Sequence, residues 1–191
     1  MMFKNLANKK IILASKSPRR QELLKGLDLC FEVKTKEIDE SFPKSIESFD
    51  VSVFLAQKKA AAFELSNDEI IITSDTTVLL NNRILNKPQN NHEAFEMLKS
   101  LSGKSHKVCT GVCIKSIEKE VLFSDFTSVT YKPLSKDEIE YYIKQYKPFD
   151  KAGSYGIQEW IGFIGIEKIE GCYYNVMGLP LSKLYQELLD F

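Results

Sequence analysis

Short blocks of apolar residues, separated by polar turns, run along the whole chain and predict both strands and helices. Buried strands are expected where apolar residues are continuous, and longer strands where they alternate with polar ones. Asn81-Asn82 separates two apolar triplets and predicts a two-residue hairpin turn. The expected strands cover about 10–14, 31–36, 70–72, 78–80, 83–85, 106–115 and 121–131, with two more on either side of Glu170-Gly171.

Helices are expected where apolar residues recur every three or four positions. Ser135-Lys136-Asp137-Glu138 forms a capping box, and Leu134 and Ile139 are placed as a hydrophobic staple, so a helix should begin there. The other expected helices cover 18–25, 48–65 and 91–101, and a last one begins near Pro180. This alternation of strands and helices favours an α/β fold with a mixed sheet, because it needs both hairpins and crossovers.

Length and composition narrow the class of protein. A chain of 191 residues suits one domain, or two lobes that share a sheet. The 26 basic and 26 acidic residues cancel, so a nucleic-acid-binding surface is not indicated. Four cysteines without CxxC spacing predict free thiols, and two histidines make a zinc site improbable. We find neither a signal peptide nor an apolar membrane segment and expect a soluble cytoplasmic protein.

The sequence Ser15-Lys16-Ser17-Pro18-Arg19-Arg20 combines a strand end, a turn and a helix start. Ser17 is a suitable N-cap, and Pro18 fits the first helical position. Two arginines beside the positive end of a helix dipole are unfavourable unless an anion lies in front of them. The motif therefore favours phosphate binding, although arginines at such positions are often merely solvated.

Further candidate residues lie at the ends of the expected elements. Asp75 follows a buried strand, where open α/β sheets present ligand-binding groups, although it could equally cap a turn. Glu40 is expected in a loop, and Lys87 precedes a proline. Lys58 and Lys59 both fall near the apolar stripe of their helix, and helical phase slightly favours Lys58 as the inward residue.

These residue types suit metal-assisted hydrolysis of a phosphoanhydride. With so few histidines, a general base would come chiefly from carboxylates. Mg²⁺ or Mn²⁺ prefers carboxylate and phosphate oxygens, and basic side chains would offset the charge of the leaving group. The same residues could also bind a nucleotide without cleaving it.

Taken together, the motifs resemble those of the Maf family of nucleoside triphosphate pyrophosphatases. They occur in the family's order over nearly the whole chain. The matching stretches are 13–24, Ser74-Asp75-Thr76, Lys87-Pro88, Leu101-Ser102-Gly103, 150–158 and 173–180. The resemblance implies one Maf-like domain over 1–191, with an elongated mixed sheet flanked by helices and a cleft between two lobes. It also implies a divalent metal, a homodimer, and attack of metal-activated water on Pα with pyrophosphate leaving.

The resemblance also assigns roles to individual residues. Asp75 matches the catalytic carboxylate that acts as general base or positions the metal-bound water, and Glu40 matches an acidic position associated with the metal. The family alignment prefers Lys59 over Lys58. The residues expected to bind substrate are Ser15, Arg19, Lys59, Lys87 and Gln158.

The segment 150–158 resembles the family branch that acts on dTTP and UTP. The sister branch, which prefers 7-methyl-GTP, is the alternative, together with a non-catalytic nucleotide-binding regulator of septum formation. The implied biological role is cleaning of the nucleotide pool, with a link to cell-division arrest. Three positions depart from the family pattern. Ser74 stands where a smaller alanine is usual, and Asn86 precedes Lys87 where glycine or an acidic residue often appears. Glu159-Trp160-Ile161 replaces a more glycine-rich stretch. Of these departures, Trp160 is the one that could reshape the base pocket and so change the choice of substrate.

Overall fold

A mixed seven-stranded sheet forms the framework of the computed structural model, which describes residues 3–191. The strand order is β2-β1-β3-β5-β6-β7, and β4 pairs with β3. Parallel pairing of β1 with β2 and β3, and antiparallel pairing of β4 with β3 and β7 with β6, confirm the predicted mixed α/β sheet. The strands are β1 (Lys10–Leu13), β2 (Phe31–Val33), β3 (Glu69–Leu80), β4 (Arg83–Leu85), β5 (Ser105–Lys115), β6 (Glu120–Tyr131) and β7 (Ile166–Glu170).

Helices flank this sheet, as predicted. The α-helices are α1 (Pro18–Lys25), α2 (Val51–Ala61), α3 (Asn91–Leu101), α4 (Lys136–Tyr146), α5 (Trp160–Gly165), α6 (Tyr173–Met177) and α7 (Leu181–Leu189). Two short 3₁₀ turns cover Lys4–Leu6 and Ala152–Ser154. No helix within residues 3–191 is long and apolar enough to cross a membrane.

The chain divides into two compact units. Unit 1 comprises residues 3–75, 110–125 and 178–191, and unit 2 comprises 76–109 and 126–177. The strands β3, β5 and β6 each contribute residues to both units.

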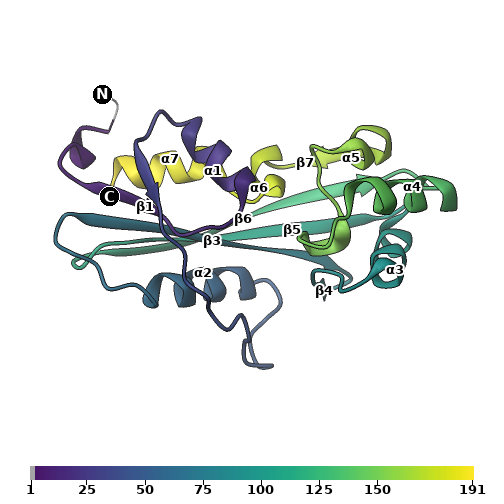
Figure 1. Cartoon of the computed structure of the whole chain (residues 1–191), viewed down its shortest axis with the longest axis horizontal. Helices are drawn as coiled ribbons and strands as arrows, with labels where there is room; N and C mark the ends of the chain where they lie inside the picture. Colours follow the sequence, from purple (N-terminus) through teal and green to yellow (C-terminus); the bar gives the residue numbers. More distant parts are fainter. Residues whose placement is uncertain (1–2) are drawn as a thin grey trace. The chain divides into compact units, whose positions relative to one another are not determined.

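In unit 1, α1 and α7 cover one face of the sheet and α2 covers the other (Figure 1). The backbone of α2 lies directly on β5, because a Cβ atom at Gly111 would come within 2.3 Å of the Ser52 carbonyl carbon and the Val53 nitrogen. The Thr73 hydroxyl also donates to the Ala56 carbonyl at 2.6 Å. The buried residues at this contact are Ala56 and Ala60 of α2 together with Ile12, Ile71 and Cys113 of the sheet. This close packing fixes α2 on the sheet.

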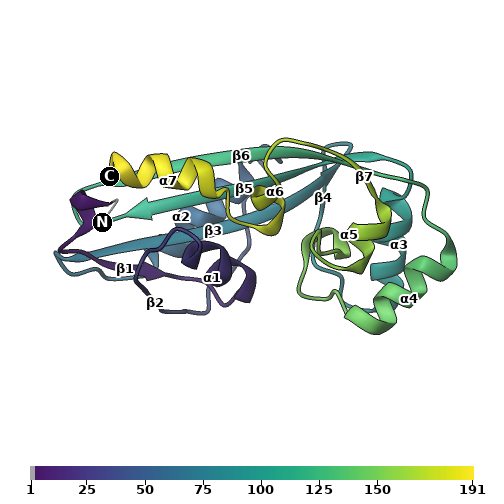
Figure 2. The ribbon, with the colours of Figure 1, turned by 90° about the horizontal axis from the view of Figure 1, so that it is seen from above.

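In unit 2, α3, α4 and α5 gather around one apolar core (Figure 2). The capping box of α4 forms as predicted: Ser135 Oγ accepts from the Glu138 nitrogen, and Glu138 accepts from the Ser135 nitrogen at 2.7 Å. Leu98, Tyr131 and Tyr142 are among the fully buried members of the core. The helices therefore support the loop between α4 and α5.

The hairpin at Asn81-Asn82 is confirmed. Both asparagines have positive φ, 51° and 63°, and Leu80 pairs with Arg83 across the turn. The primed turn type that joins antiparallel strands needs this backbone conformation, which asparagine tolerates well. All four cysteines are free, as expected.

Several predicted elements differ from the structure. The expected strand 31–36 is shorter, because β2 ends at Val33. The strand at 70–72 does not end before Asp75, because β3 continues to Leu80. Ser74-Asp75-Thr76-Thr77 contains no glycine or proline to interrupt it. The second helix is shorter than 48–65, and the segment after Gly171 forms the helix α6 rather than a strand.

His106 is a buried histidine whose ionisation should affect stability. Its Nε2 atom lies 2.7 Å from the Tyr155 hydroxyl, and burial lowers its pKa from 6.5 to about 4. Between about pH 4 and pH 6.5, His106 therefore binds a proton in the unfolded chain but not in the folded chain. The free energy of unfolding is therefore fully retained above about pH 6.5 and falls below it, by about 2 kcal/mol between pH 7.5 and 5.

His106→Gln removes this ionisable group while keeping an amide that can bond to Tyr155. We expect a variant with a flatter pH profile of the free energy of unfolding between pH 5 and 7, measured by urea denaturation. A profile as steep as that of the wild type would show that His106 does not cause the loss.

Candidate active site

The ammonium group of Lys59 is shared by two carboxylates in unit 1. Its Nζ atom lies 2.5 Å from Asp75 Oδ1 and 2.8 Å from Glu40 Oε1. The side chains of Lys59 and Asp75 are only 14% and 13% exposed, whereas that of Glu40 is 47% exposed. Three residues from a helix, a strand and a loop therefore meet at one partly buried charged cluster.

Packing of α2 explains why Lys59, rather than Lys58, belongs to this cluster. Ala56 and Ala60 face the sheet, and Lys59 lies between them in the sequence at the edge of that face. Lys58 instead pairs with the exposed Asp39 at 3.4 Å. The preference for Lys58 from helical phase was thus wrong, because the buried face of α2 includes Ala56 and Ala60, which places Lys59 next to it, whereas the Lys58 side chain is 32% exposed.

The turn from Ser15 into α1 has the predicted form. Ser17 is the N-cap and accepts from the Arg20 nitrogen, with Pro18 at the first helical position. Ser15 is buried, and its Oγ accepts from the Ser17 nitrogen at 3.2 Å. Arg19 lies in the first turn of α1. Ser15 and Arg19 therefore share the N-terminal end of α1 within unit 1.

Arg20 is a site residue that the sequence interpretation left without a specific role. Its Nε donates to the Gly178 carbonyl at 2.8 Å, and its Nη1 donates to the Ser74 carbonyl at 2.9 Å. Burial lowers the pKa of this guanidinium, and the nearby charge of Asp75 opposes that shift. Ser74 Oγ also bonds to the Gly178 carbonyl, at 3.3 Å. Arg20 thus fastens α1 to the strand residue that precedes Asp75.

Lys87 and Gln158, the other predicted substrate-binding residues, lie in unit 2. Lys87 is exposed, just after β4. The Gly153 nitrogen donates to the Asn86 carbonyl at 3.4 Å, so the 150–159 loop is joined to the segment that carries Lys87. The Oε1 atom of Gln158 is buried and lacks a hydrogen-bond partner within the described part of the chain. The structure thus brings Ser15, Arg19, Glu40, Lys59 and Asp75 into one unit and Lys87 and Gln158 into the other.

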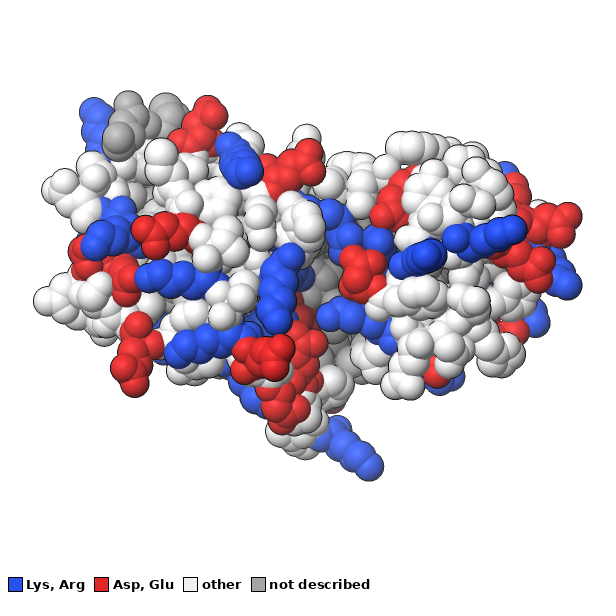
Figure 3. Space-filling view, in the orientation of Figure 1, with Lys and Arg blue, Asp and Glu red and all other residues white. Residues whose placement is uncertain are grey.

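Charge is distributed in small groups rather than in one field. On the face shown in Figure 3, acidic and basic side chains are interspersed, in keeping with the zero net charge. No group of three or more His, Cys, Asp and Glu side chains able to hold a metal lies among residues 3–191. Glu40 and Asp75 are nevertheless a fitting donor pair for Mg²⁺, which commonly uses one or two carboxylates together with substrate phosphates.

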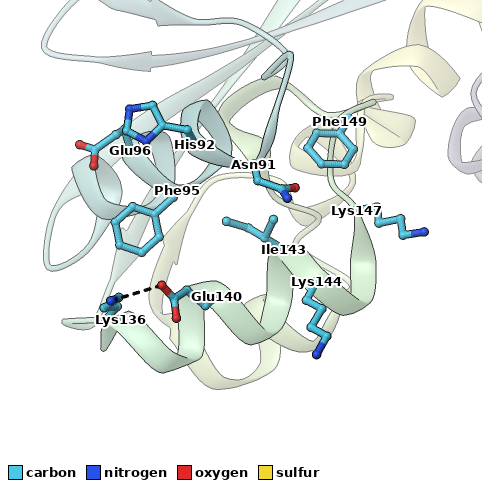
Figure 4. Close-up of a pocket in the computed structure, with 10 residues that line it drawn as sticks. All are labelled: Asn91, His92, Phe95, Glu96, Lys136, Glu140, Ile143, Lys144, Lys147 and Phe149. Atoms are coloured by element: carbon cyan, nitrogen blue, oxygen red, sulfur yellow. Dashed lines mark ion pairs between the residues drawn. The ribbon is translucent and has the colours of Figure 1, made fainter.

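A separate groove of about 720 Å³ lies between α3 and α4 in unit 2 (Figure 4). Phe95, Ile143 and Phe149 contribute its apolar lining. Its rim carries both charge signs, and Lys136 already pairs with Glu140 at 3.5 Å. None of the predicted site residues lines this groove.

Comparison with solved structures identifies a protein with a similar fold. The chain is similar to the structure of a HAM1 protein from Coxiella burnetii, with a TM-score of 0.50 and 17% sequence identity. The match covers 96% of this chain and 100% of that one. At this level of identity the similarity concerns the fold alone.

Comparison with sequences then shows the family. The family described as Maf-like protein matches residues 10–191, so the chain belongs to it. A "dTTP/UTP pyrophosphatase" of Flavobacterium psychrophilum is 53% identical over 100% of this chain and 98% of its own length. A protein of the same name from Parabacteroides distasonis is 51% identical over the full length of both chains. The resemblance inferred from the motifs is confirmed.

Arg20→Gln should destabilise unit 1 and lower any activity that depends on Asp75. The change leaves the Ser74 and Gly178 carbonyls without their guanidinium donor, which we expect to cost about 2–4 kcal/mol of unfolding free energy. Arg20→Lys keeps the charge but cannot donate to both carbonyls in a fork, so it should recover only part of the loss. Urea denaturation measures both; a wild-type midpoint for Arg20→Gln would contradict this role.

Proposed function

We propose that this protein hydrolyses dTTP and UTP to the nucleoside monophosphate and pyrophosphate. Relatives about 50% identical over nearly their full length carry the name of this activity. The observation that carries the proposal is the cluster in which Lys59 holds Glu40 and Asp75 together. A nucleotide-binding protein without turnover does not need a second, positioned carboxylate.

Asp75 is the residue that we assign as general base. Its Oδ1 atom is bonded to the Lys59 ammonium, which keeps a cation next to the carboxylate and fixes its orientation. Oδ2 would accept a proton from the attacking water. The water oxygen forms a bond to Pα, the bond from Pα to the bridging oxygen breaks, and pyrophosphate leaves with the electron pair.

Basic groups would neutralise the charge that develops on the leaving pyrophosphate. Arg19 and the backbone at the start of α1 suit phosphate oxygens, because a helix N-terminus favours anions. Lys59 can donate to phosphate as well as to the carboxylates, since an ammonium has three donors. Ser15 and Lys87 are the further groups that we assign to the triphosphate.

Glu40 and Asp75 would hold a divalent cation together with phosphate oxygens and water. Carboxylates suit Mg²⁺ or Mn²⁺, and such ions commonly retain several waters. When bound, the ion would neutralise phosphate charge and lower the pKa of its water. The residues themselves would set the orientation of the two carboxylates through Lys59.

Gln158 is proposed to recognise the pyrimidine. Its Oε1 atom is buried without a hydrogen-bond partner among residues 3–191, and a rotation of the side chain that exposes this atom would let it accept from the N3–H group of uracil or thymine. The amide nitrogen would then donate to a neighbouring ring carbonyl. Cytosine presents the reverse pattern, an acceptor at N3 beside an exocyclic amine, and would need the Gln158 amide turned by 180°. An amide held in the first orientation would therefore favour dTTP and UTP.

Three further expectations from the family complete the proposal. The activity would serve to clean the nucleotide pool in the cytoplasm, where these substrates are found. A link to cell-division arrest is part of the same expectation. We also propose a homodimer, which sedimentation analysis of the purified chain would test.

Phosphorus NMR of the purified protein with Mg²⁺ tests the reaction directly. We expect pyrophosphate with UMP or dTMP from UTP or dTTP, faster than any product from 7-methyl-GTP, CTP or ATP. Addition of EDTA should abolish turnover. Orthophosphate would contradict the proposed bond, and pyrophosphate from 7-methyl-GTP alone would assign the protein to the sister branch. Binding without any product would support a regulator.

Asp75→Asn should fold normally and lose turnover by about 100-fold or more, because the amide cannot act as a general base. The matched control is Asp68→Asn, since Asp68 is also an ion-paired aspartate of unit 1, bonded to Lys10 at 2.9 Å on the surface. Loss of such an exposed pair has little effect. Steady-state rates with UTP should therefore fall only for the first variant, and near-normal activity in Asp75→Asn would refute its role.

A further inference from the structure

A hydrogen-bonded network joins the two ends of the loop that carries Gln158. The Lys151 ammonium lies 3.1 Å from Glu159 Oε1 and 2.7 Å from Asp150 Oδ1. Lys151 is only 8% exposed and Glu159 only 18%, whereas Asp150 is 59% exposed. The ion pair between Lys151 and Glu159 is thus largely shielded from water, unlike most ion pairs on the surface of this chain.

Tyr142 of α4 extends this network into the loop. Its hydroxyl donates a short hydrogen bond to Glu159 Oε2 and accepts from the Gly156 nitrogen at 3.1 Å. Tyr142 is fully buried in the core of unit 2. One rigid side chain therefore holds a residue before Gln158 and a residue after it.

The backbone around Gln158 leaves little room for an alternative loop shape. A Cβ atom at Gly156 would meet the Glu159 carboxylate carbon at 2.7 Å. A Cβ atom at Gly162 would lie 1.9 Å from the carbonyl oxygen of Ile157. Gly162 also bonds through its nitrogen to the Glu159 carbonyl at 2.8 Å. The Glu159 side chain therefore packs closely on Gly156, before Gln158, and the first turn of α5 packs on the backbone of Ile157.

Glu159 lies in the stretch 159–161, where the resemblance to the family leads us to expect a more glycine-rich segment. The neighbouring Trp160 begins α5 and packs its ring against Tyr141 of α4, with ring centroids 4.8 Å apart. Glu159 thus contacts Tyr142 of α4, and the next residue, Trp160, contacts the neighbouring Tyr141. The substituted segment provides the contacts that a glycine-rich one lacks.

We propose that Lys151, Glu159 and Tyr142 form a brace that positions the Gln158 amide for recognition of the pyrimidine base. This inference rests on the proposed function of Gln158. The brace residues are positioning residues, because they act through the loop. A flexible loop would have to be ordered at each binding event, and that ordering weakens substrate binding.

The test compares Glu159→Gln, Tyr142→Phe and Lys151→Met with Gln158→Ala, which removes the base-reading amide itself. We expect each brace variant to raise the KM for UTP about tenfold with kcat within about threefold, since Asp75 and Lys59 belong to unit 1. The ratio of kcat/KM for UTP over CTP should fall by about tenfold, as in Gln158→Ala. Tyr142→Phe removes only one hydroxyl and provides a mild variant in case the others fail to fold.

Glu138→Gln is the matched control, because it removes the charge of another carboxylate of unit 2 that contacts a lysine. Glu138 lies 3.2 Å from Lys132, and a glutamine preserves the capping box of α4. This variant should keep the KM, kcat and UTP preference of the wild type. A similar loss of preference in the control would show that the effect is not specific to the brace and would overturn it.

Amide hydrogen exchange separates failure of the brace from failure of the proposed function. Residues 152–158 should exchange faster in Glu159→Gln than in the wild type or in Glu138→Gln. If the wild type cleaves UTP and the brace variants keep their UTP preference, the brace is refuted and the function remains. If the wild type does not cleave UTP, the proposed function fails, and unchanged exchange in Glu159→Gln would independently refute the brace.

Discussion

The contact on which the site depends is one ammonium group between two carboxylates. Without Lys59, the like charges of Glu40 and Asp75 would repel one another in a partly buried place. Lys59 can perform this role because α2 lies flat on the sheet, with Gly111 allowing the helix backbone to touch β5. A steric constraint in the core therefore determines the electrostatics of the surface cluster above it.

Arg20 provides a second constraint of a different kind. Its planar guanidinium donates in a fixed fork, through Nε to the Gly178 carbonyl and through Nη1 to the Ser74 carbonyl. The two basic residues thus have different roles. Lys59 orients the carboxylate side chains, and Arg20 fixes the main chain directly before Asp75. In unit 2, Tyr142 and Glu159 fulfil a comparable function for Gln158 through neutral and charged hydrogen bonds.

Local sequence patterns predicted most elements of the fold, because their determinants lie close together in the chain. The capping box at Ser135, the N-cap at Ser17 and the Asn81-Asn82 turn each depend on residues within a few positions. Contacts between distant residues could not be read in the same way. The choice of Lys59 over Lys58 depends on where α2 meets β5, and the role of Arg20 depends on Gly178. For the site, the family motifs identified most candidates, whereas the partners of Glu159 required the structure.

The continuity of β3 has a consequence for the kind of backbone that carries Asp75. Asp75 lies inside a strand that runs unbroken from Glu69 to Leu80, with parallel pairing to β1 in its first half and antiparallel pairing to β4 at its end. The division between the two units falls inside this strand, directly after Asp75. The residue that we assign as general base therefore stands on regular strand backbone rather than on a connecting loop.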